Sequence, residues 1–401
     1  MLYFLIKLMA ITAIRTFFNK ISAENVDYIA KDTPIIFTAN HPNTMMDPMI
    51  IGYTCKRKLH FFAKSTLFNN LIAGWFLRRI QIVPVYRKVD DPSKMDQNKE
   101  TFSKGYEILK QNKAFLIFPE GISTGDRKLS QIKTGAARIG FGAEAENDWQ
   151  LGVQIIPVGL NYANAIKFRS DVSTRFGQPI QLTDFRDVYE QNEKEAVHLV
   201  TEQIETALSK LTINLKDLEM QEIVEALERI YKQELAVDLG LETENKADDF
   251  SVTKGLINAV EWYYENEPSK VNEFKGMLNL YQRLLNRLQI KDEFLDPASS
   301  RVTFWERIKA ILYIIIMFPI YLYGLINNVI PYKFPRWYAR HFVQHKAEVA
   351  PWKMLSGTII FLIYYFIEII IFASLTGSFI WTFIYALSLI PSGNFVLQYI
   401  N

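Results

Sequence analysis

His41 and Asp47 are the two residues whose types and positions most directly suggest chemistry. The apolar segment 35–38 ends just before His41 and is flanked by Pro34 and Asn40, a pattern typical of a buried strand that ends in a polar loop. In a regular helix the two side chains would lie roughly 240° apart around the axis. A turn must therefore bring the imidazole and the carboxylate together.

A carboxylate bonded to one imidazole nitrogen fixes the tautomer and leaves the other nitrogen to take a proton from a hydroxyl. Pro48 suits the first position of a helix, and a residue before proline avoids the helical region. We therefore expect Asp47 to be the N-cap of a helix that begins at Pro48, with its carboxylate facing His41. The pair predicts a general base that needs no protein nucleophile. The alternative is a capping aspartate beside an unrelated loop histidine.

After Asp47 the chain alternates between helical and strand-like segments. We expect helices near 48–55, 66–79 and 97–111, and strands at 59–63, 81–87, 114–118 and 153–162. The alternation predicts an α/β fold with a mixed central sheet flanked by helices. Ligand sites in such folds lie at strand ends, and His41, Arg87 and Glu120 all follow or end predicted strands.

Four ordered blocks of this sequence resemble the glycerolipid acyltransferase family, which includes glycerol-3-phosphate and lysophosphatidic acid acyltransferases. The blocks are NHPNTMMDP (40–48), QIVPVYR (81–87), FPEGIS (118–123) and IIPVGLNY (155–162). Their order and spacing make the resemblance stronger than any one block, and it covers roughly residues 30–185.

The resemblance implies that His41 is the general base and that Asp47 orients it. It also implies a binding site for the acyl acceptor, to which we assign Arg87, Glu120, Gly121 and Ser123. The forked guanidinium of Arg87 suits a phosphate group. Arg127 and Lys133, in the polar segment that follows, are further candidates for phosphate contacts.

Three departures from the usual family pattern concern the acceptor. Five residues separate His41 from Asp47 where four are usual, a spacing similar to that of fungal acyltransferases that use glycerol-3-phosphate or dihydroxyacetone phosphate. Gln81 stands where a glycine is usual, and Ser123 stands where an arginine is usual. The acceptor stays open among glycerol-3-phosphate, its 1-acyl derivative and dihydroxyacetone phosphate.

The implied reaction is a direct transfer. His41 deprotonates the acceptor hydroxyl as it attacks the thioester of acyl-CoA or acyl carrier protein, and the carrier thiolate leaves. The reaction implies no acyl-enzyme, no cofactor and no metal. The single cysteine, Cys55, excludes an intramolecular disulfide and a cysteine-based zinc site, and fits a reducing compartment.

A competing motif lies at residues 121–125, where GISTG matches the G-x-S-x-G nucleophile elbow of hydrolases. It would make Ser123 the nucleophile of an esterase or lipase, with a base drawn from His198, His341 or His345. A proline and a glutamate separate the motif from the preceding strand, and no apolar helix follows at once, which argues against an elbow. A non-catalytic lipid-binding membrane protein is a further alternative, against which the intact His41 and Asp47 pair argues.

Charge is unevenly distributed along the chain, although the net charge is only +2. Residues 1–140 contain 21 Lys/Arg and 11 Asp/Glu, whereas the remainder contains 24 and 32. A basic first third suits phosphorylated substrates, an acyl carrier or an anionic lipid surface. No zinc-finger spacing, RNA-recognition motif or basic zipper is present, so we expect no nucleic-acid partner.

The composition predicts a membrane protein, since 49% of the residues are hydrophobic. The sequence divides into four regions. We expect an interfacial helix in 1–25, a catalytic domain in 26–185, a helical region in 186–300 and a membrane anchor in 301–401. The anchor contains apolar segments at 310–330, 354–375 and 378–390, the last ending at Pro391, and thus two or three spans. Pro319 and Gly324 would permit a kinked, re-entrant first segment, with the catalytic domain facing the cytoplasm.

Overall fold

The computed structural model describes residues 2–79, 82–86, 96, 98–217, 220–241, 246–289 and 303–400. The chain divides into two compact units. Unit 1 comprises residues 1–261 together with 345–350, and unit 2 comprises 262–344 and 351–401. Residues 345–350 therefore belong to unit 1, although they lie late in the sequence.

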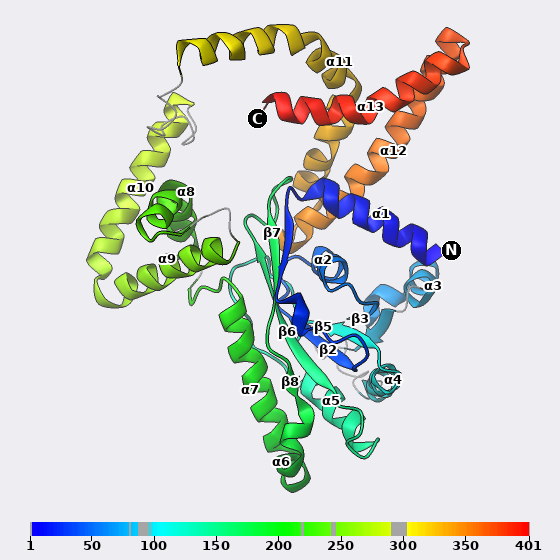
Figure 1. Ribbon diagram of the computed structural model, residues 1–401, viewed down its shortest axis with the longest axis vertical. Helices are drawn as coiled ribbons and strands as arrows, with labels where there is room; N and C mark the ends of the chain where they lie inside the picture. The colour runs from blue at the N-terminus through cyan, green and yellow to red at the C-terminus, as the bar shows by residue number, and fades with distance from the viewer. Residues whose placement is uncertain are drawn as a thin grey trace. The chain divides into compact units, whose positions relative to one another are not determined.

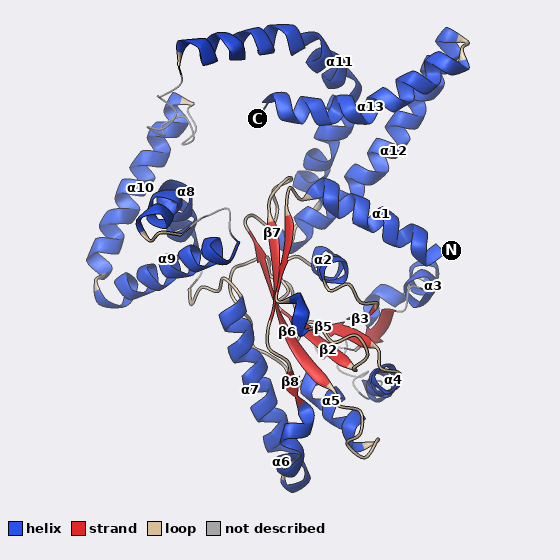
Figure 2. Ribbon diagram, viewed as in Figure 1, coloured by secondary structure: helices blue, strands red, loops and turns tan. Residues whose placement is uncertain are grey.

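Unit 1 is built on a mixed sheet of eight strands (Figures 1 and 2). The strands are β1 (Ile21–Glu24), β2 (Ile35–Ala39), β3 (Leu59–Lys64), β4 (Ile82–Val85), β5 (Ala114–Ile117), β6 (Gln154–Tyr162), β7 (Val172–Phe176) and β8 (Ile180–Gln181). Their order is β1-β7-β6-β2-β5-β3-β4, and β8 pairs with β6. Strands β6, β2, β5, β3 and β4 are parallel, whereas β7 and β8 run antiparallel to β6. The predicted α/β fold with a mixed sheet is confirmed.

Helices cover both faces of this sheet. They are α1 (Leu2–Phe17), α2 (Met46–Thr54), α3 (Leu71–Arg79), α4 (Asn98–Lys110), α5 (Gly135–Ala145), α6 (Arg186–Gln191) and α7 (Glu193–Leu211). Every residue of β2 is buried, because alternate side chains point to opposite covered faces. Ile36 belongs to a core shared with α4, α5 and α7, whereas Phe37 packs edge-on against Phe176.

Most predicted elements occur within a few residues of their expected positions. The predicted helix at 66–79 is shorter, because a 3-10 turn (Ser65–Phe68) precedes α3. The expected strand at 81–87 is β4, with Gln81 and Arg87 outside the described residues. Helix α5 and strands β1, β7 and β8 were not predicted. The sequence of α5, GAARIGFGAEA, contains three glycines, which lower helix propensity, and its tertiary packing outweighs that cost.

The polar region after the sheet is helical, as expected. It contains α8 (Gln221–Asp238), α9 (Lys246–Asn266) and α10 (Pro268–Leu288). Helix α10 belongs to unit 2. At the N-terminus of the chain, α1 buries Ile14 and Phe17 but exposes Leu8 and Met9. Its predicted interfacial role and the division of the chain into four regions stay predictions.

Among its described residues, unit 2 contains three helices that are long and apolar enough to cross a membrane. They are α11 (Phe304–Phe342), α12 (Val349–Thr376) and α13 (Phe379–Ile400). The prediction that the last segment ends at Pro391 is wrong, because α13 continues through this proline. Asn328 in α11 accepts a hydrogen bond from Tyr365 in α12 at 2.5 Å, so polar side chains join these apolar helices. Length and composition thus support membrane integration.

Candidate active site

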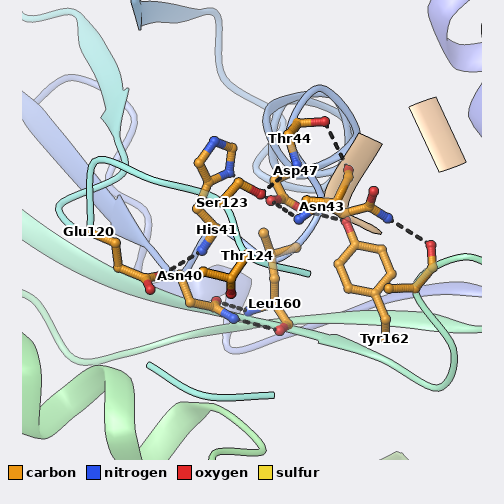
Figure 3. Close-up of polar contacts among 12 residues, drawn as sticks. Asn40, His41, Asn43, Thr44, Asp47, Glu120, Ser123, Thr124, Leu160 and Tyr162 are labelled. Carbon is orange, nitrogen blue, oxygen red and sulfur yellow. Dashed lines mark hydrogen bonds and ion pairs between the residues drawn. The ribbon is translucent and has the colours of Figure 1, made fainter. Parts of the chain in front are cut away.

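The candidate site forms where three parallel strands end at the same edge of the sheet. His41 follows β2, Glu120 follows β5, and Tyr162 is the last residue of β6. Strand β2 lies between β5 and β6, so the loops after these strands converge. Polar side chains from distant parts of the sequence therefore meet here (Figure 3).

His41 and Asp47 are joined by a direct hydrogen bond. His41 Nδ1 lies 2.8 Å from Asp47 Oδ2, as the sequence led us to expect. An ionised carboxylate can only accept hydrogen bonds, so Nδ1 carries the proton of the neutral imidazole. The lone pair of Nε2 is left to take a second proton. The imidazole stacks on Phe118, with ring centroids 3.8 Å apart, which fixes the plane of the ring.

Asp47 is completely buried and accepts two further hydrogen bonds. The backbone N–H of Asn43 donates to Oδ2 at 2.8 Å, and the hydroxyl of Tyr162 donates to Oδ1 at 2.5 Å. Burial, together with the adjacent Asp47, raises the pKa of Tyr162 well above its ordinary value, so the phenol keeps its proton and stays a donor. The buried carboxylate is thus compensated by three donors.

The predicted N-cap role of Asp47 is wrong. Helix α2 begins at Met46, with Met45 as its N-cap, so Asp47 is the second helical residue. Its carboxylate still faces the strand exit, because the side chain reaches back over the first turn to the N–H of Asn43. The expectation about direction was therefore right although the position within the helix was not. A negative charge in the first turn also suits the helix dipole.

Glu120 holds two loops together at the sheet edge. Its Oε1 accepts the backbone N–H of His41 at 2.8 Å, and its Oε2 accepts that of Ser130 at 2.8 Å. Burial raises the pKa of Glu120, although both N–H groups favour the charged form. The carboxylate also lines the cavity beside His41. Gly121, the next residue, has φ +69°, and its N–H donates to the carbonyl of Phe118.

A cavity of about 420 Å³ adjoins His41 and Glu120. Its walls come from the loop at 124–129, the end of β6, the segment 212–214 and the start of α8. Basic and acidic groups both reach it, including Arg127, Lys128, Asp126, Glu222 and Lys346. The cavity is large enough for a small polar ligand next to the imidazole.

The structure does not bring all the predicted acceptor-binding residues together at the cavity beside His41. Arg87 lies outside the described residues. Arg127 lines the cavity, but its guanidinium pairs with Glu228 at 2.7 Å and donates to the Ala163 carbonyl. A Cβ on Gly121 would fall against the ammonium of Lys133. The Lys133 side chain therefore lies beside Gly121, the residue after Glu120.

Ser123 does not occupy a nucleophile elbow. Strand β5 ends at Ile117 and the next helix, α5, begins only at Gly135, so the strand–turn–helix geometry of that motif is missing here. The hydroxyl of Ser123 instead accepts the backbone N–H of Thr44 at 3.1 Å. The hydrolase interpretation therefore lacks its structural basis.

Three contributors to the site were not predicted from the sequence. Tyr162 anchors Asp47, Phe118 stacks on His41, and Asn40 pairs with both backbone groups of Leu160 at 2.7 and 3.0 Å. Each lies in one of the four blocks noted above, which was the available signal. Only the folded sheet shows that the blocks at 40–48, 118–123 and 155–162 meet.

Residues 20–161 match the acyltransferase family model, and this part of the chain is an acyltransferase-family domain. The chain is 25% identical over 283 residues to glycerol-3-phosphate O-acyltransferase 1 of Saccharomyces cerevisiae, covering 66% of this chain and 36% of the yeast protein. It is 32% identical over 136 residues to glycerol-3-phosphate O-acyltransferase 2 of that yeast, covering 34% and 18%. A 1-acyl-sn-glycerol-3-phosphate acyltransferase of Streptococcus pneumoniae is 28% identical over 192 residues, covering 47% and 64%. The chain thus spans only about a third of the first yeast relative and less of the second.

Proposed function

We propose that the protein is a membrane-bound O-acyltransferase of phospholipid synthesis, which moves a fatty acyl group from a thioester to a hydroxyl of a glycerol phosphate. The observation that carries this proposal is the His41 and Asp47 hydrogen bond beside a polar cavity at the sheet edge. The acyltransferase-family domain and the names of its relatives supply the reaction class.

His41 acts as the general base in this proposal. Nε2 takes the proton of the acceptor hydroxyl as the oxygen attacks the thioester carbonyl, and Asp47 stabilises the imidazolium that forms. The tetrahedral intermediate collapses with cleavage of the carbon–sulfur bond, and the imidazolium returns its proton to the departing thiolate. The ester and the free thiol are the products, and the histidine ends neutral.

The cavity supports a small phosphorylated acceptor. Basic groups that line it are Arg127, Lys128 and Lys346, and Arg87 follows strand β4 in the sequence. Glycerol-3-phosphate is our preferred acceptor, because the spacing between His41 and Asp47 resembles that of fungal enzymes and two yeast relatives carry that name. Acyl-CoA or acyl carrier protein would supply the acyl group, with no further cofactor.

Product analysis separates the candidate acceptors. Full-length protein in detergent is incubated with palmitoyl-CoA or palmitoyl-acyl carrier protein and, in separate reactions, glycerol-3-phosphate, its 1-acyl derivative or dihydroxyacetone phosphate. Mass spectrometry should find an acylglycerol phosphate formed from glycerol-3-phosphate. Acylation of only another acceptor would reassign the substrate, free fatty acid in every reaction would indicate hydrolysis, and no product would favour a non-catalytic lipid-binding protein.

We place the catalytic domain on the cytoplasmic face of its membrane. Cys55, the single cysteine, is buried at the C-terminal end of α2 and is compatible with a reducing compartment. A cytoplasmic site would also meet a soluble acyl donor directly.

A further inference from the structure

The turn that carries His41 and Asp47 contains a strained residue. Thr44 has φ +27°, a conformation that L residues, and β-branched ones above all, rarely adopt. It lies between His41, to which we assign proton transfer, and Asp47, which orients the imidazole. Such a conformation persists only where surrounding contacts hold it.

Two contacts from distant parts of the sequence hold Thr44 in place. Its backbone N–H donates to the hydroxyl of Ser123 at 3.1 Å, and its own hydroxyl donates to the carbonyl of Ala347 at 3.1 Å. Ala347 is only 3% exposed and lies in the short connection between α11 and α12. A segment flanked by two apolar helices therefore contacts the turn of the candidate base.

The same connection packs against the loop after β5. Lys346 pairs with Asp126 at 2.9 Å, and Lys346 also lines the cavity beside His41. Gly125 has φ +79°, and a Cβ on it would lie 2.9 Å from the backbone nitrogen of Ala347. Absence of a side chain at Gly125 thus permits a close backbone approach.

From these contacts we propose that residues 345–350 are a positioning element of the acyl-transfer site. These residues join two apolar helices, α11 and α12, and hold Thr44 in place. Through Thr44 they maintain the geometry of His41 and Asp47. The inference rests on the proposed acyl transfer for its kinetic consequence. Thr44 and Ala347 are positioning residues, because they act through the turn and touch no reacting atom.

This placement also constrains the path of α11. Residues 1–261 and 345–350 form one compact unit, so both lie on the same side of a membrane. In the described part of the chain between them, α11 is the one helix apolar and long enough to cross. A single crossing would separate the two segments, so α11 enters the bilayer and returns, or lies along its surface. Figure 1 shows α11 bending sharply, and three prolines lie inside it.

Two pairs of variants test the positioning role. Thr44→Val should lower kcat about tenfold or more with little change in KM, since small displacements of catalytic groups have large effects on rate. Thr44→Ser, which keeps the hydroxyl, should restore most of the rate. The control Thr201→Val removes a comparable buried hydroxyl-to-carbonyl bond in α7 and should leave kcat within about twofold.

The second pair separates backbone strain from contact with residues 345–350. Gly125→Ala and Gly152→Ala both place alanine at positive φ, but nothing lies within 4 Å of a Cβ at Gly152. Only Gly125→Ala should therefore lower kcat strongly. Equal kcat values for the two alanine variants, or a Thr44→Val enzyme with wild-type kcat, would overturn the positioning role.

A labelling experiment tests the path of α11 without any need for turnover. Single cysteines are introduced in a Cys55→Ala background at Glu205 in unit 1, at His345, and at Thr376 at the end of α12. In sealed vesicles, an impermeant maleimide should reach Glu205→Cys and His345→Cys from the same side, and Thr376→Cys from the other. Labelling of Glu205→Cys and His345→Cys from opposite sides would refute the inference. An inactive wild type with the expected labelling would instead refute only the proposed function.

Discussion

At the residue scale, the site depends on how a buried carboxylate is compensated. Asp47 is completely buried, and a tyrosine, a backbone N–H and an imidazole each donate to it. Hydrogen bonds to charged groups contribute more than neutral ones, and an unpaired buried charge is costly. Tyr162 therefore contributes both to stability and to the orientation of the carboxylate that His41 needs.

Tyr162→Phe tests this contribution with a minimal change. The variant keeps the ring but removes the donor to Asp47, and we expect unfolding to become easier by about 1.5–3 kcal/mol. The kcat should also fall, because the carboxylate loses one of its fixed contacts. Thermal unfolding and steady-state kinetics measure the two effects. Tyr28→Phe, at a position 38% exposed, serves as the control, and matching behaviour of both variants would contradict the assignment.

Glu120 gives a prediction about pH. Burial raises its pKa above 4.5 in the folded state, so the folded protein holds this proton where the unfolded chain has lost it. Its contribution to the free energy of unfolding is therefore greatest below pH 4.5 and is lost as pH rises through the raised pKa. The amide of Glu120→Gln cannot titrate. The difference in free energy of unfolding between wild type and this variant should therefore shrink as pH rises from 4.5 through the raised pKa of Glu120. Unfolding free energies measured against pH test this, and a constant difference would contradict the raised pKa.

The sequence predicted the proton-transfer pair but not its surroundings. His41 and Asp47 are close in the chain, and a turn between them was enough to infer their contact. Tyr162 lies more than a hundred residues away, and its contact with Asp47 depends on the adjacency of β2 and β6. Local pattern carries no information on such strand pairing.

At the scale of elements, the parallel strands determine where the chemistry lies. The apolar runs of β2 and β6 were recognisable because both faces of these strands are covered. Helix α5 was missed because its glycines weaken the local helical signal. Those glycines permit close packing, since a Cβ at Gly140 would meet Leu182 and one at Gly142 would meet Tyr106. Tertiary packing explains a sequence that local propensity does not.

Gly159 shows the same effect within β6. A Cβ there would lie 2.2 Å from the carbonyl oxygen of Leu211, a backbone atom that cannot easily move. Gly159→Ala should therefore destabilise the fold by about 1–3 kcal/mol or more. Gly255→Ala in α9, where nothing lies within 4 Å, should instead stabilise it by about 0.5–1 kcal/mol. Unfolding in denaturant measures both, and equal effects would contradict the predicted clash.

At the scale of the whole molecule, composition predicted the membrane helices. It did not predict that the connection between α11 and α12 belongs to the catalytic unit. The apolar segments were evident from length alone. That residues 345–350 belong to the catalytic unit follows from tertiary contacts at Thr44 and Asp126, for which the sequence contains no periodic signal. The re-entrant path considered for residues 310–330 stays a prediction, and our proposal for α11 rests on this connection.

The measurement that tests the central claim most directly is acceptor-dependent thiol release from palmitoyl-CoA, comparing wild type with His41→Ala in detergent. The wild type should release thiol only when acceptor is present. The variant should lose about 10² to 10⁴ in rate while its thermal unfolding stays close to that of wild type, because a general base has been removed from a folded protein. Undiminished acceptor-dependent turnover by folded His41→Ala would contradict the account.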